Sequence, residues 1–184
     1  MAAPRLFLVA PEGLGATQIL ACARAACTAG DVASIVLPQS ALKAAQELQA
    51  LGLAVLCLGE TKSGCDGVHL NLDGDAAQAR KALGPNAIVG VYCAASRHAA
   101  MEAAEAGADY IAFSQNTYAP KEPIIGWWAD LFEIPCVAYD PVEEKDLDIL
   151  LPQNPDFIRP GDGMWASPEQ AAEVVAKLMQ RMTA

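Results

Sequence analysis

Short apolar runs bounded by turn residues recur along this chain about every twenty to twenty-five residues, with longer amphipathic segments between them. Eight such runs predict β-strands at 6–10, 33–37, 53–58, 67–70, 87–92, 110–114, 136–139 and 157–159. Segments with helical spacing lie at 16–29, 40–51, 75–83, 96–106, 125–132, 143–150 and 168–182. Only the connection 58–66 is too short for a helix. The alternation predicts an α/β protein built from repeated βα units.

Eight alternating units in 184 residues favour a closed (β/α)8 TIM barrel, in which 1–184 form one compact domain with short loops. A doubly wound open sheet is the competing fold. Its dinucleotide-binding variant would carry a Gly-x-Gly-x-x-Gly fingerprint after the first strand, where this chain reads PEGLG at 11–15. We therefore expect the barrel.

Charge and hydropathy limit the partners of the protein. The formal net charge is −10, with only 12 Lys and Arg and no basic cluster, so we expect binding to neither nucleic acid nor an anionic membrane. The longest apolar runs are much shorter than a membrane span, and the first residues lack the features of a signal peptide, which predicts a cytoplasmic protein. The sequence leaves homo-oligomerisation open.

The six cysteines show no Cys-x-x-Cys spacing, which argues against a zinc or redox site. Cys57, Cys93 and Cys136 lie in or beside predicted strands, where a buried thiol acts as a small apolar side chain. We expect these three cysteines to lie in the core.

Four segments in the middle of the chain carry a family resemblance: DGVHL at 66–70, ARKALG at 79–84, IVGV at 88–91 and AGADYI at 106–111. They resemble the central portion of the thiamine phosphate synthase family, which also includes a thiazole tautomerase branch. The resemblance implies a TIM barrel and a Mg²⁺-dependent transferase reaction of thiamine biosynthesis. In that reaction a pyrimidine pyrophosphate loses pyrophosphate, and the nitrogen of a thiazole phosphate captures the resulting cation.

The resemblance also implies a metal site at the end of the fourth strand. With one residue deleted relative to the family, Asp73 matches the metal-binding aspartate, and Asp75 would be the N-cap of the next helix. The alternative for Asp73 is an ordinary turn residue before Gly74. Glu60 corresponds loosely to a second family carboxylate, and a solvated loop glutamate is the other interpretation.

Substrate contacts are expected from the loops after the fifth and sixth strands. Lys121 matches a phosphate-contacting lysine of the family, while Tyr92, Ser114 and Gln115 are candidates for contacts with the substrate rings. Tyr92 could instead pack at its strand end. Gln115 stands where the tautomerase branch has an acid–base histidine, and an amide cannot transfer protons in that role. A tautomerase that uses the family residue is therefore disfavoured.

A second group of candidates follows the eighth strand. Arg159 could bind an anionic group, and the backbone of Gly161 and Gly163 could bind phosphate. A surface arginine at a strand end is the alternative for Arg159. His69 lies within a strand and is expected to be a hydrogen-bonded structural residue.

The chain departs from the family pattern at two strands. The second strand, IVLPQ at 35–39, lacks the family's cations. The seventh strand ends in a pair of glycines in the family, and here VAYDP at 137–141 replaces them, with the bulk of Tyr139 and the negative charge of Asp140. Asp140 would repel phosphate, and Asp140 and Asp162 together could select a neutral or cationic ligand instead of a diphosphate. The sequence leaves open an active synthase, an enzyme acting on a related phosphorylated heterocycle, and a catalytically degenerate paralogue with a binding or regulatory role. No residue is assigned a catalytic function.

Overall fold

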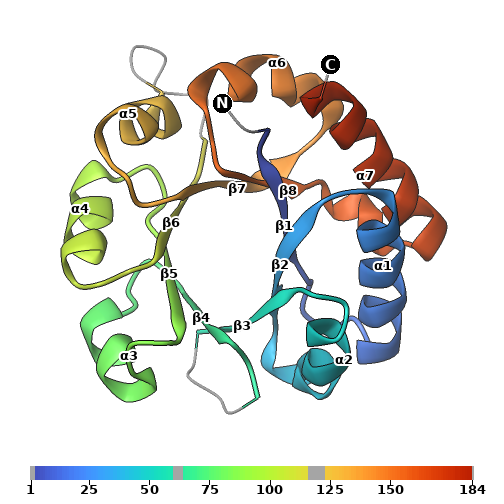
Figure 1. Ribbon diagram of the computed structural model, residues 1–184, viewed down its shortest axis with the longest axis horizontal. Coiled ribbons are helices and arrows are strands. Elements are labelled where there is room, and N and C mark those ends of the chain that lie inside the picture. Colours follow the sequence, from blue (N-terminus) through green and yellow to red (C-terminus); the bar gives the residue numbers. More distant parts are fainter. Residues whose placement is uncertain (1–2, 60–63, 116–122, 184) are drawn as a thin grey trace.

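The computed structural model describes residues 3–59, 64–115 and 123–183. Eight parallel strands pair in chain order, and β1 closes onto β8 to complete a barrel (Figure 1). The strands are β1 (Arg5–Val9), β2 (Val32–Leu37), β3 (Ala54–Leu58), β4 (Gly67–Leu70), β5 (Ile88–Tyr92), β6 (Tyr110–Phe113), β7 (Cys136–Val142) and β8 (Phe157–Pro160). The predicted (β/α)8 TIM barrel is therefore confirmed.

Helices surround the barrel and cover its outer face (Figure 1). They are α1 (Ala16–Ala29), α2 (Ala45–Gln49), α3 (Ala76–Leu83), α4 (Arg97–Glu105), α5 (Ile124–Leu131), α6 (Leu147–Leu150) and α7 (Pro168–Met182). Short 3₁₀ turns are η1 (Gln39–Ala44), η2 (Glu144–Asp146), η3 (Leu151–Gln153) and η4 (Asp162–Trp165). The single helix predicted at 40–51 is divided into η1 and α2.

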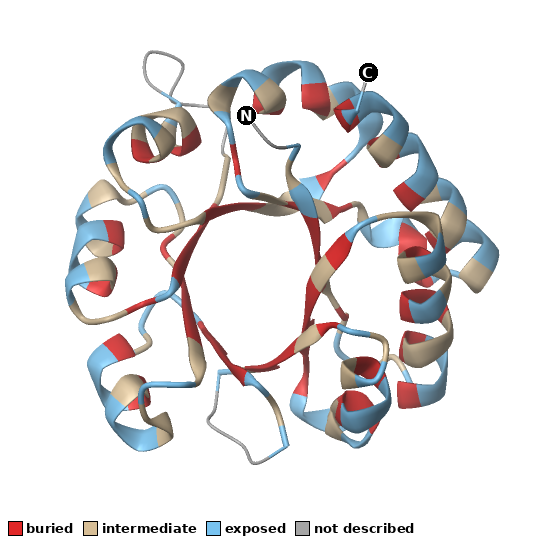
Figure 2. Cartoon of the chain, viewed as in Figure 1, coloured by how far each residue is buried: buried red, intermediate tan, exposed pale blue. Residues whose placement is uncertain are grey.

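Alternation along each strand produces two apolar cores. In β1, Leu6 and Leu8 face the helices and Phe7 faces the barrel axis, and all three are buried. Buried positions accordingly line the strands and the inner faces of the helices (Figure 2). Cys57, Cys93 and Cys136 are buried, as predicted.

Three aspartates explain the motifs that begin β4, β6 and β8. Each immediately precedes its strand and accepts a hydrogen bond from a backbone N–H near the beginning of the preceding strand. The acceptor and donor pairs are Asp66 and Val55 (2.8 Å), Asp109 and Val89 (2.7 Å), and Asp156 and Cys136 (2.8 Å). The aspartate thus accepts a hydrogen bond from a backbone N–H at the beginning of the sheet, and it links two adjacent strands.

Side-chain caps begin several of the helices. Asp75 accepts a hydrogen bond from the Gln78 N–H at 2.9 Å, so the N-cap predicted for α3 is confirmed. Ser96 caps α4 and Ser167 caps α7 in the same way. Each cap contributes about 1 kcal/mol, and together they fix where the loops at the carboxyl ends of the strands give way to helix.

Candidate active site at the barrel mouth

The carboxyl ends of β6, β7 and β8 bring together six polar or aromatic side chains. We call Ser114, Gln115, Tyr139, Asp140, Arg159 and Asp162 the mouth cluster. In TIM barrels, the loops at this end of the strands carry the active site. The mouth cluster therefore stands where substrate chemistry is expected, and it includes three of the predicted contact residues.

Ser114 and Gln115 join the end of β6 to β7. The Ser114 hydroxyl donates to Asp140 Oδ2 at 2.7 Å. The Gln115 amide donates to the Asp140 carbonyl and accepts from the Asp140 N–H, both at 3.1 Å. Two of the three candidates for ring contacts are thus already bonded to Asp140, and they hold the ends of the two strands together.

Arg159 lies in β8 with only 17% of its side chain exposed. Its Nη1 donates to the Tyr139 carbonyl at 3.3 Å, and its Nη2 donates to Asp162 Oδ1 at 2.8 Å. The guanidinium carbon lies 5.3 Å from the centroid of the Tyr139 ring. Arg159 is the only Lys or Arg in the carboxyl-terminal half of a strand in the described part of the chain.

Inside the barrel, His69 packs beneath the mouth cluster. Its ring stacks on Tyr139 with a centroid distance of 4.8 Å, and its Nδ1 lies 2.6 Å from the Tyr110 hydroxyl. Burial, helped by the positive charge of Arg159, lowers the pKa of His69 to about 3. The ring is therefore neutral at physiological pH, in agreement with the structural role expected from the sequence.

Two glycines make room for this arrangement. A Cβ on Gly90 would lie 1.8 Å from Cζ of Tyr110, and a Cβ on Gly67 would lie 1.9 Å from the Ile88 carbonyl oxygen. We call Gly67, His69, Gly90 and Tyr110 the glycine–aromatic layer. Gly67 and Gly90 are thus required by close approach, of a neighbouring strand in the first case and of an aromatic ring in the second.

Tyr92 extends the aromatic packing toward the mouth. It is half-buried at the end of β5, and its ring centroid lies 5.1 Å from that of Tyr139. Tyr92 thus packs at its strand end and borders the mouth cluster. Both interpretations made from the sequence are compatible with this position.

Asp73 lies exposed in the turn between β4 and α3. It borders a cavity of about 550 Å³, which it shares with Gly59 at the end of β3 and with Asp75 and Gln78 at the start of α3. Its carboxylate oxygens are hard ligands of the kind that Mg²⁺ prefers. The described residues contain no group of three His, Cys, Asp or Glu side chains able to hold a metal. Asp73 therefore fits Mg²⁺ as one ligand whose remaining positions would be filled by water and by the substrate.

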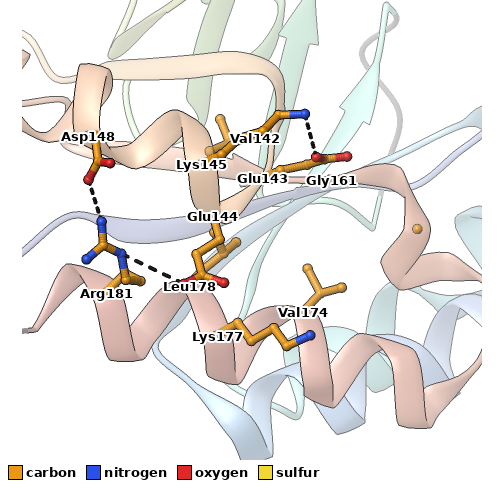
Figure 3. A pocket seen from close by; sticks show the side chains of 11 residues that line it. Val142, Glu143, Glu144, Lys145, Asp148, Gly161, Val174, Lys177, Leu178 and Arg181 are labelled. Atoms are coloured by element: carbon orange, nitrogen blue, oxygen red, sulfur yellow. Dashed lines mark hydrogen bonds and ion pairs between the residues drawn. The ribbon is translucent and has the colours of Figure 1, made fainter.

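Gly161 and Gly163 border a different cavity, of about 590 Å³, between η2 and α7 (Figure 3). Its floor is apolar, and charged side chains surround it. These charges pair with one another: Lys145 lies 3.0 Å from Glu143, and Arg181 forms ion pairs with Asp148 and Glu144. Lys121 and Glu60, two further candidates from the sequence, lie outside the described residues.

The sequence did not single out Tyr139 as a stacking partner or Asp162 as the partner of Arg159. The sequence nevertheless contains an indication of each role. Tyr139 has the same inward parity as Val137 in β7, and Asp162 follows Arg159 by three residues. The pairing of Arg159 with Asp162 follows only from the structure, in which the end of β8 lies close to the start of η4.

The fold and its mouth define a TIM-barrel protein whose ligand would meet the ends of β4 to β8. A thiamine phosphate pyrophosphorylase from Pyrococcus furiosus has the same fold, with a TM-score of 0.77 and 18% identity over 97% of this chain and 95% of the other. Among the described residues, no helix is long and apolar enough to cross a membrane.

Sequence comparison defines the family. The profile described as thiamine monophosphate synthase matches residues 60–156. A thiamine-phosphate synthase of Rhodospirillum centenum is 36% identical over 94% of each chain. One of Erythrobacter litoralis is 38% identical over 81% of this chain and 67% of the relative. The chain belongs to the thiamine monophosphate synthase family, which confirms the predicted resemblance and its link to thiamine biosynthesis.

Proposed function

We propose that this protein is a thiamine phosphate synthase, a transferase that couples a pyrimidine pyrophosphate to a thiazole phosphate. The observation that carries the proposal is the 36% identity to a relative of that name, which extends over 94% of both chains. A match of this extent includes the strands and loops of the mouth as well as the central motifs. The ligands would be small phosphorylated heterocycles, and the protein would act in the cytoplasm.

The anionic parts of the substrates would be held by few groups. Asp73 would hold Mg²⁺ together with pyrophosphate oxygens, because Mg²⁺ is commonly bound by one or two carboxylates plus substrate phosphates. When bound, the metal would neutralise charge on the leaving pyrophosphate. Lys121 and Arg159 would bind anionic oxygens. Of the two glycines expected to bind phosphate, Gly163 would donate its N–H, since the Gly161 N–H is bonded to the Val142 carbonyl at 2.9 Å.

The ring contacts would come from the other side of the mouth. Tyr92 and Tyr139 offer aromatic surface next to each other, with ring centroids 5.1 Å apart. Ser114 and Gln115 would orient a heterocycle by hydrogen bonds once a substrate competes with Asp140 for them. Packed aromatic rings below the mouth would keep water away from the reacting carbon, which favours capture of the cation by the thiazole nitrogen.

A catalytically degenerate paralogue with a small-molecule binding or regulatory role is the second candidate. The observation in its favour is that the polar groups of the mouth are already paired within the chain. Ser114 and Gln115 bond to Asp140, and Arg159 bonds to Asp162. Within the mouth cluster, the two carboxylates of Asp140 and Asp162 accompany the single cation of Arg159.

Direct assay of thiamine phosphate formation separates the two candidates. Purified protein would be incubated with pyrimidine pyrophosphate, thiazole phosphate and Mg²⁺, beside an Asp73→Ala variant. Asp130→Ala is a matched control, since Asp130 is an exposed carboxylate near the end of α5. We expect turnover in the parent and the control, and a loss of about 100-fold or more in Asp73→Ala. Absence of turnover from folded parent protein would favour the degenerate paralogue.

A further inference from the structure

Two arginines of this chain pair with aspartate in different ways. In the pair of Arg5 with Asp31, Nε donates to Oδ2 at 2.9 Å and Nη2 donates to Oδ1 at 2.8 Å. Both donors on the side of the guanidinium are used, which is the bidentate arrangement that carboxylates and phosphates favour. Arg5 thus shows, within this chain, how an arginine pairs with a carboxylate when both Nε and Nη2 are used.

Arg159 lacks this bidentate pairing. Only Nη2 reaches Asp162, through one oxygen at 2.8 Å. Nε is buried and finds no hydrogen-bond partner in the described part of the chain. A buried N–H without an acceptor is costly, because it has lost its hydrogen bonds to water. The edge of the guanidinium formed by Nε and Nη2 therefore makes one hydrogen bond, whereas an anion could accept two there.

The rest of the guanidinium is held firmly in place. Nη1 is bound to the Tyr139 carbonyl, and the plane lies over the Tyr139 ring, which itself stacks on His69. Asp162, by contrast, has 56% of its side chain exposed and lies at the first position of η4. The arginine is fixed, while the carboxylate is free to leave toward solvent.

We propose that Asp162 is an internal substitute for an anionic ligand group and sets the anion affinity of the mouth. A phosphate or pyrophosphate group displaces the Asp162 carboxylate and accepts hydrogen bonds from both Nε and Nη2 of Arg159. The inference rests on the proposed function in so far as it takes Arg159 as the residue that meets the anion. Asp162 is then a specificity-determining residue: it rejects ligands that cannot use both donors.

Titration of inorganic pyrophosphate into the full chain tests this, in the presence of a chelator so that Mg²⁺ plays no part. We expect Asp162→Asn to bind pyrophosphate roughly three- to tenfold more tightly than the parent, the range expected for removing a competing ion pair to a partly buried arginine. Asp130→Asn changes the net charge equally, and Asp130 is an exposed carboxylate near the end of α5 that lines neither cavity. This control should change the affinity less than about twofold. Adding Arg159→Gln to Asp162→Asn should abolish the gain.

The outcomes are independent of turnover. A gain in Asp162→Asn that depends on Arg159 supports the inference, even if the parent makes no thiamine phosphate. Equal affinities of Asp162→Asn and Asp130→Asn would overturn it, even if the parent is an active synthase. A gain that survives Arg159→Gln, or pyrophosphate binding by none of the proteins, would overturn it as well. Circular dichroism of each variant checks that the barrel is intact.

Discussion

The glycine–aromatic layer and the mouth cluster are adjacent in the barrel, but different kinds of interaction hold them together. In the layer, Gly67 and Gly90 leave no space for a Cβ, and the Tyr110 hydroxyl contacts a fully buried His69. In the mouth cluster, half-buried or exposed carboxylates pair with hydroxyl, amide and guanidinium groups. The layer is a steric requirement of the fold, whereas the mouth consists of exchangeable polar bonds.

The layer lies where the chain follows the sequence pattern of its family, and the mouth cluster includes positions where the chain departs from that pattern. The layer lies within the four segments that carry the resemblance, between 66 and 111. Of the two departures, the one at Tyr139 and Asp140 belongs to the mouth cluster, and the other lies at the end of β2. Steric contacts tolerate no substitution without backbone movement, while polar pairs can be exchanged for others or for a ligand. The two regions should therefore respond to mutation on different scales.

The largest effect is expected in the layer, from Gly67→Ala. The new Cβ would lie 1.9 Å from the Ile88 carbonyl oxygen, so β4 and β5 must separate. Overpacking against backbone should lower the free energy of unfolding by about 3 kcal/mol. Gly163→Ala is the control, since a Cβ there meets nothing within 4 Å. Urea denaturation measures both, and equal stability of the two variants would contradict the steric interpretation of the layer.

Acid should act on the same layer through His69. Burial lowers its pKa to about 3, against an ordinary value of 6.5. Between these values the unfolded chain binds a proton that the folded chain excludes, so the free energy of unfolding falls as the pH falls below 6.5. The slope contributed by this residue is about 1.4 kcal/mol per pH unit, and it vanishes above pH 6.5.

His69→Leu removes this titration and provides the control. Denaturation midpoints of the parent and the variant would be measured at pH 7, 6 and 5. The stability of the parent should fall more steeply with acidification than that of the variant. Parallel pH dependences would show that His69 accepts a proton in the folded state as readily as in the unfolded state.

The barrel was predictable because its signals are local. Short apolar runs bounded by turn residues identified each strand, and the capping residue Asp75 identified the start of α3. The end of β7 was missed by three residues. Asp140 and Pro141 interrupt the apolar pattern there, but after a shift in register Val142 pairs with Pro160 and accepts from the Gly161 N–H. Pairing with a distant strand outweighed the local sequence.

The mouth was less predictable because its bonds join residues far apart in the chain. Ser114 and Asp140 are separated by 26 positions, and neither type of residue implies the other. Their pairing follows from the neighbouring ends of β6 and β7. The sequence could name Ser114, Gln115 and Arg159 as polar groups at strand ends, but not which of them the chain itself would engage.

The smallest effect is expected in the mouth, from breaking the bond between Ser114 and Asp140. Ser114→Ala removes a 2.7 Å hydrogen bond to a half-buried carboxylate that solvent can partly replace. We expect the free energy of unfolding to fall by about 1 kcal/mol, less than for either change in the layer. A double-mutant cycle with Asp140→Asn measures the coupling, which should be of similar size if the bond is made in solution. A coupling near zero would mean that the Asp140 carboxylate is already bonded to solvent, and that Gln115 and the backbone join the ends of β6 and β7 without it.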